Sequence, residues 1–520
     1  MTSDASAPQS RSATRPPRWR GWARRAVALL LIATLAAIGI WNTTKPLPPG
    51  THVSTPWVPT PADQVRLLID TTTADGFGRR ILEQQIFDEL LRVVRDAREF
   101  IVLDMFLFND QRGALAQTAD SPATLPLRPL SRELRDALID ATRRNPRVRV
   151  LVISDPINDV YGGEPSADFA MLRAAGAEVV RTDLDRLRDS NPLYSSIWRL
   201  AIRWWSGDGE GPGWLPNPLD SGPSRVTFRA WARLLNYKAN HRKTLIADDG
   251  RGGLIGIVGS ANAHDASGAH SNVALELRGP ALVPLLRSEL EIARFSGGNV
   301  DDAVPPGIVE RAAAPPAGAG PQVFVRTLTE GALLEGVLER LGSTRAGDRI
   351  DCAMFYLSDR QVLERLIAAA TRGVEIRLIL DPNRDAFGRQ KGGLPNRPVA
   401  SELVSRSDGA IKVRWFRTRG EQFHTKLLLI RSSDRIWLTT GSANFTRRNL
   451  QDLNLEANLA VEAPLDTPIA VEAVRYFETL WANRAPVGVE YTADFGAYAD
   501  PSQTSYWAYR LLEGTGFSMF

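Results

Sequence analysis

Cysteine is almost absent from this 520-residue sequence, which contains one copy, Cys352. A single cysteine excludes an intrachain disulfide and a cysteine-rich metal site. Histidine is also scarce, with five residues in the chain. The net charge is only +4, so a pI of about 9.3 is weak evidence for nucleic-acid binding. The content of 43% hydrophobic and 23% charged residues is typical of a globular protein, and the length allows two domains.

Charged residues are also missing from one long stretch near the N-terminus. No charge occurs between Arg25 and Lys45, and the intervening AVALLLIATLAAIGIWNTT has about the length of a membrane helix. Arginines dominate the residues before it, which predicts a cytoplasmic N-terminus. We therefore predict a basic cytoplasmic segment (1–25) and a transmembrane signal anchor (26–44). The catalytic region would then lie outside the cytoplasmic membrane, in the periplasm. A cleaved signal peptide and a buried core helix are the alternatives.

One pattern of helices and strands occurs twice after a Pro-rich segment (45–60) that we interpret as a stalk. The buried-strand sequence FIVLDMFLFND is matched downstream by IDCAMFYLSD, and VRVLVISDPIND is matched by VEIRLILDPNRD. A helix precedes each first strand; in the first half its predicted apolar face consists of Leu82, Ile86, Leu90 and Val93.

This repetition predicts an α/β fold made of tandem duplicated domains, each a mixed β-sheet flanked by helices. The predicted domains are 61–300 and 322–490. An Ala-, Gly- and Pro-rich linker (301–321) separates them, and a C-terminal tail (491–520) follows.

Two of the five histidines begin matching groups of polar residues. Each is followed by a lysine two positions on, then by a Gly-Ser-Ala-Asn tetrapeptide, and then by an acid in a predicted strand. The first group is His241, Lys243, Asp248, Ser260, Asn262 and Glu276, and the second is His424, Lys426, Ser442, Asn444 and Glu456. A histidine in a strand is often only a core residue, but chance is a poor explanation for two matching groups. We therefore interpret both groups as functional.

This arrangement resembles the phospholipase D superfamily, whose signature H-x-K-x4-D followed by G-S-x-N is present twice between about residues 66 and 490. The second copy departs from the signature, because Arg431 occupies the aspartate position. The strand sequences and the NHRK context look most like bacterial cardiolipin synthases and related phosphatidyltransferases. The resemblance implies two domains packed about a pseudo-two-fold axis with one shared active site. It also implies that His241 is the nucleophile and His424 the general acid/base.

These residue types suit the cleavage of a phosphodiester. A neutral imidazole can attack phosphorus to form a phosphohistidine, while a protonated one donates to the leaving oxygen. The two lysines and two asparagines, with Ser260 and Ser442 close behind, are expected to bind phosphate oxygens. Glu276 and Glu456 are expected to orient the histidine rings, and Asp248 to brace the structure. Because lysines and amides already form a clamp, we expect no metal and no cofactor.

The first half contains a Trp-rich insertion at about residues 185–235. Its tryptophans are Trp198, Trp204, Trp205 and Trp214. Together with Arg199 and Arg203 they suit a bilayer interface or an anionic lipid headgroup. The alternative is an insertion that packs over the mouth of the active site. His264 and His270 follow the first Gly-Ser-Ala-Asn and either line the substrate pocket or are ordinary loop residues.

The sequence therefore predicts a membrane-anchored phospholipase D-type phosphodiesterase or phosphatidyltransferase that acts on phospholipids. Cardiolipin synthesis is one candidate reaction, and we expect activity as a monomer because one chain carries both motifs. A nuclease of the same superfamily is an alternative, although the weak net charge argues against a nucleic-acid partner. A noncatalytic binding protein built on this fold is the second alternative.

Overall fold

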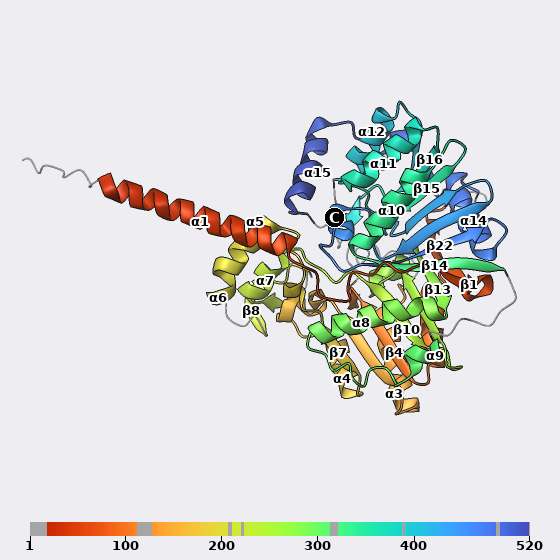
Figure 1. Cartoon of the computed structure of the whole chain (residues 1–520), viewed down its shortest axis with the longest axis horizontal. Coiled ribbons are helices and arrows are strands. Elements are labelled where there is room, and N and C mark those ends of the chain that lie inside the picture. The colour runs from red at the N-terminus through yellow and green to blue at the C-terminus, as the bar shows by residue number, and fades with distance from the viewer. Residues whose placement is uncertain are drawn as a thin grey trace, which may run out of the picture.

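The structure is a computed structural model that describes residues 18–111, 127–205, 211–219, 223–312, 321–386, 389–390, 392–484, 489–518 and 520. Residues 1–17 of the predicted cytoplasmic segment, residues 313–320 of the predicted linker and the side chain of Trp205 lie outside this description. Two α/β halves pack against each other, and helix α1 (Arg18–Thr44) projects from them (Figure 1).

The first half contains an eight-stranded mixed sheet in the order β3-β2-β13-β11-β10-β4-β6-β7. Its strands are β2 (Val65–Ala74), β3 (Arg80–Glu83), β4 (Phe100–Met105), β6 (Arg149–Ser154), β7 (Glu178–Arg181), β10 (Lys243–Asp248), β11 (Leu254–Gly259) and β13 (Asn272–Arg278). The main helices around it are α2 (Ile86–Asp96), α3 (Leu130–Arg144), α4 (Ala167–Ala174) and α8 (Val283–Phe295). Strands β4, β6 and β7 are parallel, and the remaining pairs are antiparallel.

The second half contains a nine-stranded sheet in the order β1-β14-β22-β21-β20-β15-β16-β19-β23. Its strands are β1 (Val58–Pro61), β14 (Gln322–Thr329), β15 (Arg349–Met354), β16 (Glu375–Leu380), β19 (Ile411–Phe416), β20 (Lys426–Arg431), β21 (Arg435–Gly441), β22 (Ala457–Pro464) and β23 (Thr492–Asp494). Its main helices are α10 (Gly331–Ser343), α11 (Arg360–Thr371), α12 (Asn396–Arg406), α14 (Pro468–Trp481) and α15 (Gln503–Thr515). The order β14-β22-β21-β20-β15-β16-β19 repeats β2-β13-β11-β10-β4-β6-β7, which confirms the predicted duplication.

One apolar core joins the two sheets. Phe100 and Leu275 of the first sheet belong to the same buried cluster as Leu427 and Leu459 of the second. Helices on the outer faces, including α2 and α3 on the first sheet and α10 and α11 on the second, bury the other side of each sheet. Burial on both faces explains why the central strands are continuous apolar runs rather than alternating ones.

The first predicted helix begins later than its apolar spacing suggested. Leu82 lies in strand β3, and α2 starts at Ile86. The carboxylate of Asp70 accepts the backbone N–H groups of Gln85 at 2.7 Å and Ile86 at 3.0 Å. A buried carboxylate that satisfies free N–H groups at a helix start fixes where the helix begins. The predicted face that included Leu82 was therefore wrong at its first residue.

The segment predicted as a stalk is partly built into the second sheet. Strand β1 pairs with β14, placing Val58 opposite Val325, and Ser54 bridges Leu328. At the other edge, β23 from the predicted C-terminal tail pairs with β19. Both segments cover edge strands whose backbone groups would otherwise lack partners, so neither is a free extension.

Asp248 braces the outer end of the first sheet. Its carboxylate accepts the backbone N–H groups of Arg98, Glu99 and Phe100 at 3.0, 2.7 and 3.1 Å, and that of Gly250 at 3.0 Å. These bonds hold the chain as it enters β4. At the equivalent position of the second sheet Arg431 stands opposite Arg349. The motif aspartate thus supports the sheet rather than the chemistry.

We expect Asp248→Ala to lower the free energy of unfolding by about 3 kcal/mol, because each buried N–H left without an acceptor costs about 1–3 kcal/mol. Arg431→Ala is the matched control, with an expected change within about 0.5 kcal/mol, as for most surface substitutions. Urea unfolding of the full chain in detergent measures both. Equal destabilisation by the two variants would contradict the bracing role.

Candidate active site

The two motif histidines lie at the starts of equivalent central strands, just ahead of β10 and β20. The N–H of His241 donates to the carbonyl of Leu455 in the second half at 2.9 Å, and the N–H of Ser271 in the first half donates to the carbonyl of Gln422 at 3.0 Å. Each histidine segment is thereby joined by a backbone hydrogen bond to a segment of the opposite half, and this segment also carries the side chain that contacts the histidine ring. The two histidine segments, which the resemblance places in one shared site, therefore each contact the opposite half at the interface.

His241 is held by a carboxylate from the other half. Its Nδ1 lies 2.9 Å from Oε1 and 3.1 Å from Oε2 of Glu456, which is fully buried. Ser442 and Asn449 also donate to this carboxylate. Burial opposes ionisation of Glu456, but His241, Lys243 and Ser442 outweigh it and lower its pKa. Glu456 therefore contacts the ring through Nδ1 and not through Nε2.

His424 is held by an amide instead of a carboxylate. Its Nδ1 lies 3.1 Å from Oδ1 of Asn272, and the Ser260 hydroxyl donates to the same oxygen at 3.1 Å. The two histidines therefore have the same geometry but different partners. Burial lowers the pKa of His424 well below its usual value, and Lys426, His270, Lys243 and His241 lower it further.

The orienting role predicted for Glu276 is wrong. Glu276 lies about 14 Å further along β13 than Asn272, at about 3.4 Å per residue. It pairs with Arg66 at 3.1 Å and with Arg92 and Arg278 at 3.6 Å. The spacing from the motif serine gave no signal: Glu456 is 14 residues after Ser442, while Asn272 is 12 and Glu276 is 16 residues after Ser260. Looking only for an acid hid the amide at the matching position.

The two motif lysines occupy equivalent positions. Nζ of Lys243 donates to the carbonyl of His241 at 2.6 Å, and Nζ of Lys426 donates to that of His424 at 3.0 Å. Burial lowers the pKa of Lys243 to about 7, an effect that Glu456 partly offsets. Burial and the neighbouring Lys243 lower the pKa of Lys426 well below its usual value. Cations crowded in this way are stabilised by a bound anion.

The motif asparagines and serines have different surroundings. Oδ1 of Asn262 accepts the N–H of Leu107 at 3.3 Å, and Oδ1 of Asn444 has no hydrogen-bond partner among the described residues. The hydroxyl of Ser442 donates to Glu456 and accepts the N–H of Ala457 at 3.0 Å. In the same way, the hydroxyl of Ser260 donates to Asn272 and accepts the N–H of Val273 at 3.0 Å. Since both serines are fully buried and already bonded, they hold the ring partners, which replaces the phosphate contact predicted for them.

Two aspartates hold the histidine segments in place. They lie in the matched Asp-Pro dipeptides of the two halves, and no role was predicted for them from the sequence. Oδ2 of Asp155 accepts the N–H of Asn240 at 2.7 Å, and Oδ2 of Asp381 accepts that of Phe423 at 2.7 Å. Each acceptor thus fixes the peptide directly before a motif histidine. Burial raises the pKa of Asp155 to about 7. Their occurrence in matched Asp-Pro dipeptides was the available signal.

A buried ion-pair network lies behind the site. Arg242, the residue after the first histidine, contacts Glu330 at 2.7 Å and Glu289 at 3.4 Å. Oε1 of Glu330 also accepts the backbone N–H of Glu456 at 3.1 Å. Arg242 is thus linked through Glu330 to the residue that orients His241. Breaking such a network would displace both halves of the site.

Of the two remaining candidate histidines, His270 lies beside the site. Its ring centre is 6.0 Å from that of His424, and its Nδ1 accepts the N–H of Gln422 at 3.2 Å. His264 is half-buried in the short strand β12 (Ala263–His264). Within the described residues no group of three or more His, Cys, Asp or Glu side chains could hold a metal ion.

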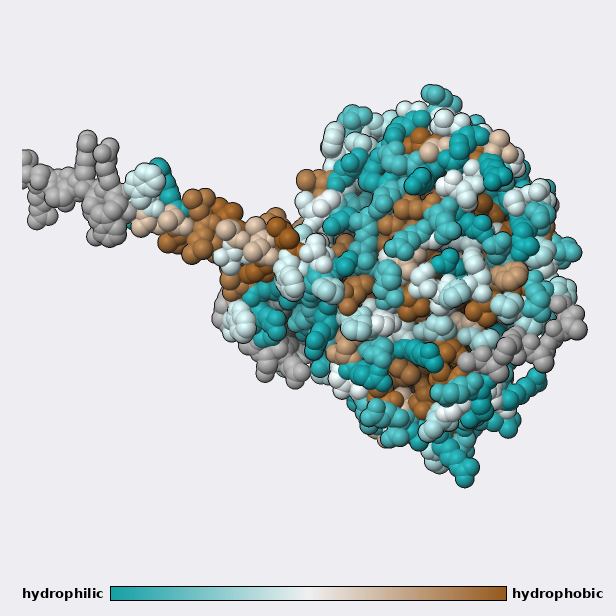
Figure 2. All heavy atoms as spheres, viewed as in Figure 1, coloured by the Kyte–Doolittle hydropathy of each residue, from teal (hydrophilic) through white to brown (hydrophobic). Residues whose placement is uncertain are grey.

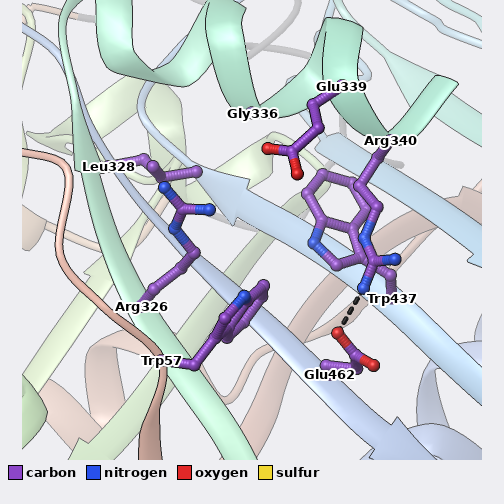
Figure 3. Close-up of a pocket in the computed structure, with 8 residues that line it drawn as sticks. All are labelled: Trp57, Arg326, Leu328, Gly336, Glu339, Arg340, Trp437 and Glu462. Atoms are coloured by element: carbon purple, nitrogen blue, oxygen red, sulfur yellow. Dashed lines mark hydrogen bonds and ion pairs between the residues drawn. The ribbon is translucent and has the colours of Figure 1, made fainter. Parts of the chain in front are cut away.

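A separate cavity of about 230 Å³ lies beside α10 and the second sheet, where Trp57 and Trp437 flank arginine and glutamate side chains (Figure 3). Its charged lining residues are Arg326, Glu339, Arg340 and Glu462. None of the motif residues lines it, so this cavity is distinct from the histidine pair.

Comparison with known proteins gives a family match in the second half of the chain. Residues 337–481 match the family model described as cardiolipin synthase, PLD-like domain. No curated protein matches the sequence.

Three solved structures are similar in fold. Phosphatidylserine synthase from Haemophilus influenzae Rd KW20 is 12% identical, with 88% of this chain and 94% of that chain covered and a TM-score of 0.48. Polyphosphate kinase from Porphyromonas gingivalis is 14% identical, with 83% and 51% covered and a TM-score of 0.41. Nuc, a phospholipase D family member from Salmonella typhimurium, is 21% identical, with 31% and 95% covered and a TM-score of 0.24.

The chain thus presents two His-Lys motifs at one interface of a duplicated α/β fold. The family match lies in the second half, and the first half carries the twin motif on the same strand order. Residues 337–481 therefore belong to a phospholipase D-like domain family, and this match supports phosphodiesterase or phosphatidyltransferase activity at the level of the family.

Acid should destabilise the protein through its buried histidines. Burial lowers the pKa of His241 to about 4 from an ordinary value of 6.5. Between these values the unfolded chain binds a proton that the folded chain does not, so stability falls as the pH drops from about 6.5 to about 4. We expect the melting temperature to fall across this window, and to fall less in His241→Asn.

Differential scanning fluorimetry of the full chain across this pH range measures the effect. His52→Asn is the matched control, since the His52 side chain is 41% exposed and lies outside the site. If the melting temperature of both variants falls with pH as much as that of the wild type, burial of His241 does not cause the loss of stability in acid.

Proposed function

We propose that the protein is a membrane-anchored phosphatidyltransferase or phosphodiesterase that cleaves phospholipids through a phosphohistidine on His241. The observation that carries this proposal is the unequal pairing of the two histidines, His241 with Glu456 and His424 with Asn272. The match to a phospholipase D-like domain of cardiolipin synthase supports the phospholipid substrate class.

The two chemical steps use the two rings in turn. Nε2 of His241 attacks phosphorus, and the bond from phosphorus to the alcohol oxygen of the headgroup breaks as His424 donates a proton to that oxygen. In the second step, His424 takes a proton from water or an alcohol. The oxygen so activated attacks phosphorus, and the bond to Nε2 of His241 breaks. The protein returns to its starting protonation state.

The ring partners favour His241 as the nucleophile. A phosphorylated imidazole carries positive charge, which the Glu456 carboxylate stabilises more strongly than the Asn272 amide could. His424, without a carboxylate, loses its proton more easily and so suits proton transfer. Since an adjacent anion raises the pKa of an imidazole, a bound phosphodiester would supply the charge that keeps His424 protonated for the first step.

The lysines and asparagines would bind the phosphate. Lys243 and Lys426 place two cationic groups at one site, and a bound phosphodiester anion would relieve their mutual repulsion. Asn262 accepts from Leu107 through its oxygen, which leaves its amide hydrogens to donate. The lysines also lie near the rings of Phe106 and Phe355, at 4.9 and 5.3 Å from the ring centres. These contacts would hold the ammonium groups in place between turnovers.

Helix α1 supports a retained membrane anchor. Gly21–Thr44 is long and apolar enough to cross a membrane. Its inner end is bonded to the body: the N–H of Asp189 donates to the carbonyl of Asn42 at 2.9 Å, and Nζ of Lys45 donates to the carbonyl of Asp185 at 2.7 Å. Such contacts favour retention over cleavage. With arginines ahead of the helix, the body would lie on the periplasmic side.

Phosphatidylglycerol vesicles containing the purified full chain test the reaction. We expect cardiolipin and glycerol if an alcohol is the acceptor, or phosphatidic acid if water is, as measured by mass spectrometry of the lipids. His241→Ala should lower the rate by at least about 10²-fold, because the nucleophile is lost. Wild-type protein quenched with SDS near neutral pH, where the N–P bond survives, should carry a phosphatidyl group on His241.

Glu276→Gln is the matched control for Glu456→Gln. We expect the Glu456 variant to lose on the order of 10²-fold in rate, because proton transfer and ring orientation contribute about that much, while the Glu276 variant keeps its rate. No lipid change across several phospholipids would sink the proposal, and cleavage of single-stranded DNA would then be measured.

Asn272→Asp tests the division of roles between the histidines. A carboxylate beside His424 favours the charged ring and raises its pKa, so proton release becomes harder. We expect the limb of the pH–rate profile that reports His424 to move to higher pH. The change is isosteric and removes one bond, the amide N–H of Asn272 donated to the carbonyl of His270 at 3.3 Å. An unshifted profile would contradict the assignment of His424 as the acid/base.

A further inference from the structure

The length of α1 constrains how deeply the body sits in a membrane. The charge-free stretch 26–44 is about 28 Å long at 1.5 Å per residue, close to the roughly 30 Å of a bilayer's hydrocarbon core. Thr34, Leu35, Ile38 and Gly39 are already half-buried or buried against the protein. The free part before Thr34 is only about 12 Å long, which is too short to cross. The packed part must therefore also lie within the bilayer.

Helix α5 (Pro192–Ile197) is the element that packs on this inner part of α1. A Cβ placed on Gly39 would lie 2.9 Å from the hydroxyl of Ser196 and 3.6 Å from the carbonyl of Pro192, so the two helices are in close contact. Figure 1 shows α5, α6 (Arg203–Trp205), α7 (Phe228–Leu234) and β8 (Pro212–Pro216) gathered where α1 meets the body. An element in contact with the buried part of a membrane helix lies at the same depth.

The outward face of α5 and of the turns that follow is apolar. Leu193, Ile197 and Leu200 are spaced at i, i+4 and i+7, and their exposed fractions are 74%, 43% and 37%. Trp204 continues this face with 76% exposed, and the guanidinium of Arg203 lies 5.7 Å from its ring centre. Four large apolar side chains facing outward on one short segment are unusual for a surface in water.

A second apolar face lies nearby on α15. Trp507 and Leu511, four residues apart, are 64% and 66% exposed. The end of this helix is fixed against the insertion: Gly516 approaches Ser190 so closely that a Cβ there would lie 1.6 Å from its carbonyl oxygen. Phe517 packs edge-on against Tyr237 with ring centres 5.7 Å apart. Figure 1 shows α15 on the side of the body from which α1 projects.

The surroundings of these two faces favour lipid as their occupant. Figure 2 shows the hydrophobic colouring of α1 reaching its junction with the body, where α5 packs on it. A tryptophan with a nearby arginine suits the boundary between acyl chains and headgroups, where the guanidinium reaches phosphate or water; the indole N–H of Trp204 itself donates to the carbonyl of Arg199 at 2.9 Å.

We propose that Leu193, Ile197, Leu200 and Trp204, together with Trp507 and Leu511, form a lipid-facing surface embedded in the outer leaflet around α1. This inference rests on the proposed membrane anchoring. The body is then held partly within the bilayer instead of above it, so a phospholipid reaches the protein without first leaving the membrane.

Site-specific quenching tests the surface in the full chain. The one native cysteine, Cys352, is only 1% exposed, so single introduced cysteines can be labelled with a polarity-sensitive fluorophore. Ile197→Cys and Trp507→Cys report the proposed surface. Val471→Cys on α14 is the control, since Val471 is an apolar residue 52% exposed on another helix. Each labelled protein is placed in phosphatidylethanolamine and phosphatidylglycerol vesicles that contain an acyl-chain spin-labelled lipid.

We expect the spin-labelled lipid to quench positions 197 and 507 several-fold more than position 471, and aqueous iodide to show the reverse order. Iodide quenching of position 197 or 507 as strong as that of position 471 would overturn the surface. Protection of either position from both quenchers would also overturn it, because a second protein copy would then cover the face.

The quenching result is independent of catalysis. Lipid quenching without phospholipid turnover would support the surface while the proposed reaction fails. Turnover with positions 197 and 507 exposed to iodide would overturn the surface while the proposed reaction stands.

Discussion

The site depends on an exchange of acceptors between the two halves. Glu456 from the second half holds His241 of the first, and Asn272 from the first half holds His424 of the second. Neither half contains an oriented histidine by itself, so the two sheets must pack face to face before either ring is positioned. The shared apolar core and the ion pair of Arg242 with Glu330 hold the halves in that arrangement.

Burial of the site lowers the pKa values of its histidines and lysines. Two lysines and two histidines are enclosed together with one well-bonded carboxylate, and desolvation lowers the pKa of each cationic group. The cationic groups of such a site have too little negative charge near them until an anion binds. The same low-dielectric surroundings strengthen the interaction of Glu456 with His241, so one acid-for-amide difference between the copies gives the two histidines different electrostatic surroundings.

Much of the fold could be predicted because its signals are local and repeated. Continuous apolar runs indicated buried strands, and their repetition indicated two equivalent sheets. The start of α2 could not be predicted from spacing, because the carboxylate that fixes it, Asp70, lies on a strand earlier in the chain. The edge positions of β1 and β23 were missed for a similar reason, since a Pro-rich segment and a tail carry no mark of the strand that they pair with.

The sequence by itself determined the reactive groups: two histidines, two lysines and their Gly-Ser-Ala-Asn companions are readable because each motif is contiguous. Only the tertiary structure decided which residue supports which ring. Asn272 and Glu276 occupy one strand, and nothing local distinguishes them. Their distance from His424 is set by how the opposite half docks, so that Asn272 reaches His424 while Glu276 is paired with arginines. Contacts between segments far apart in the chain leave no spacing pattern, and they appear only when the sheets have packed.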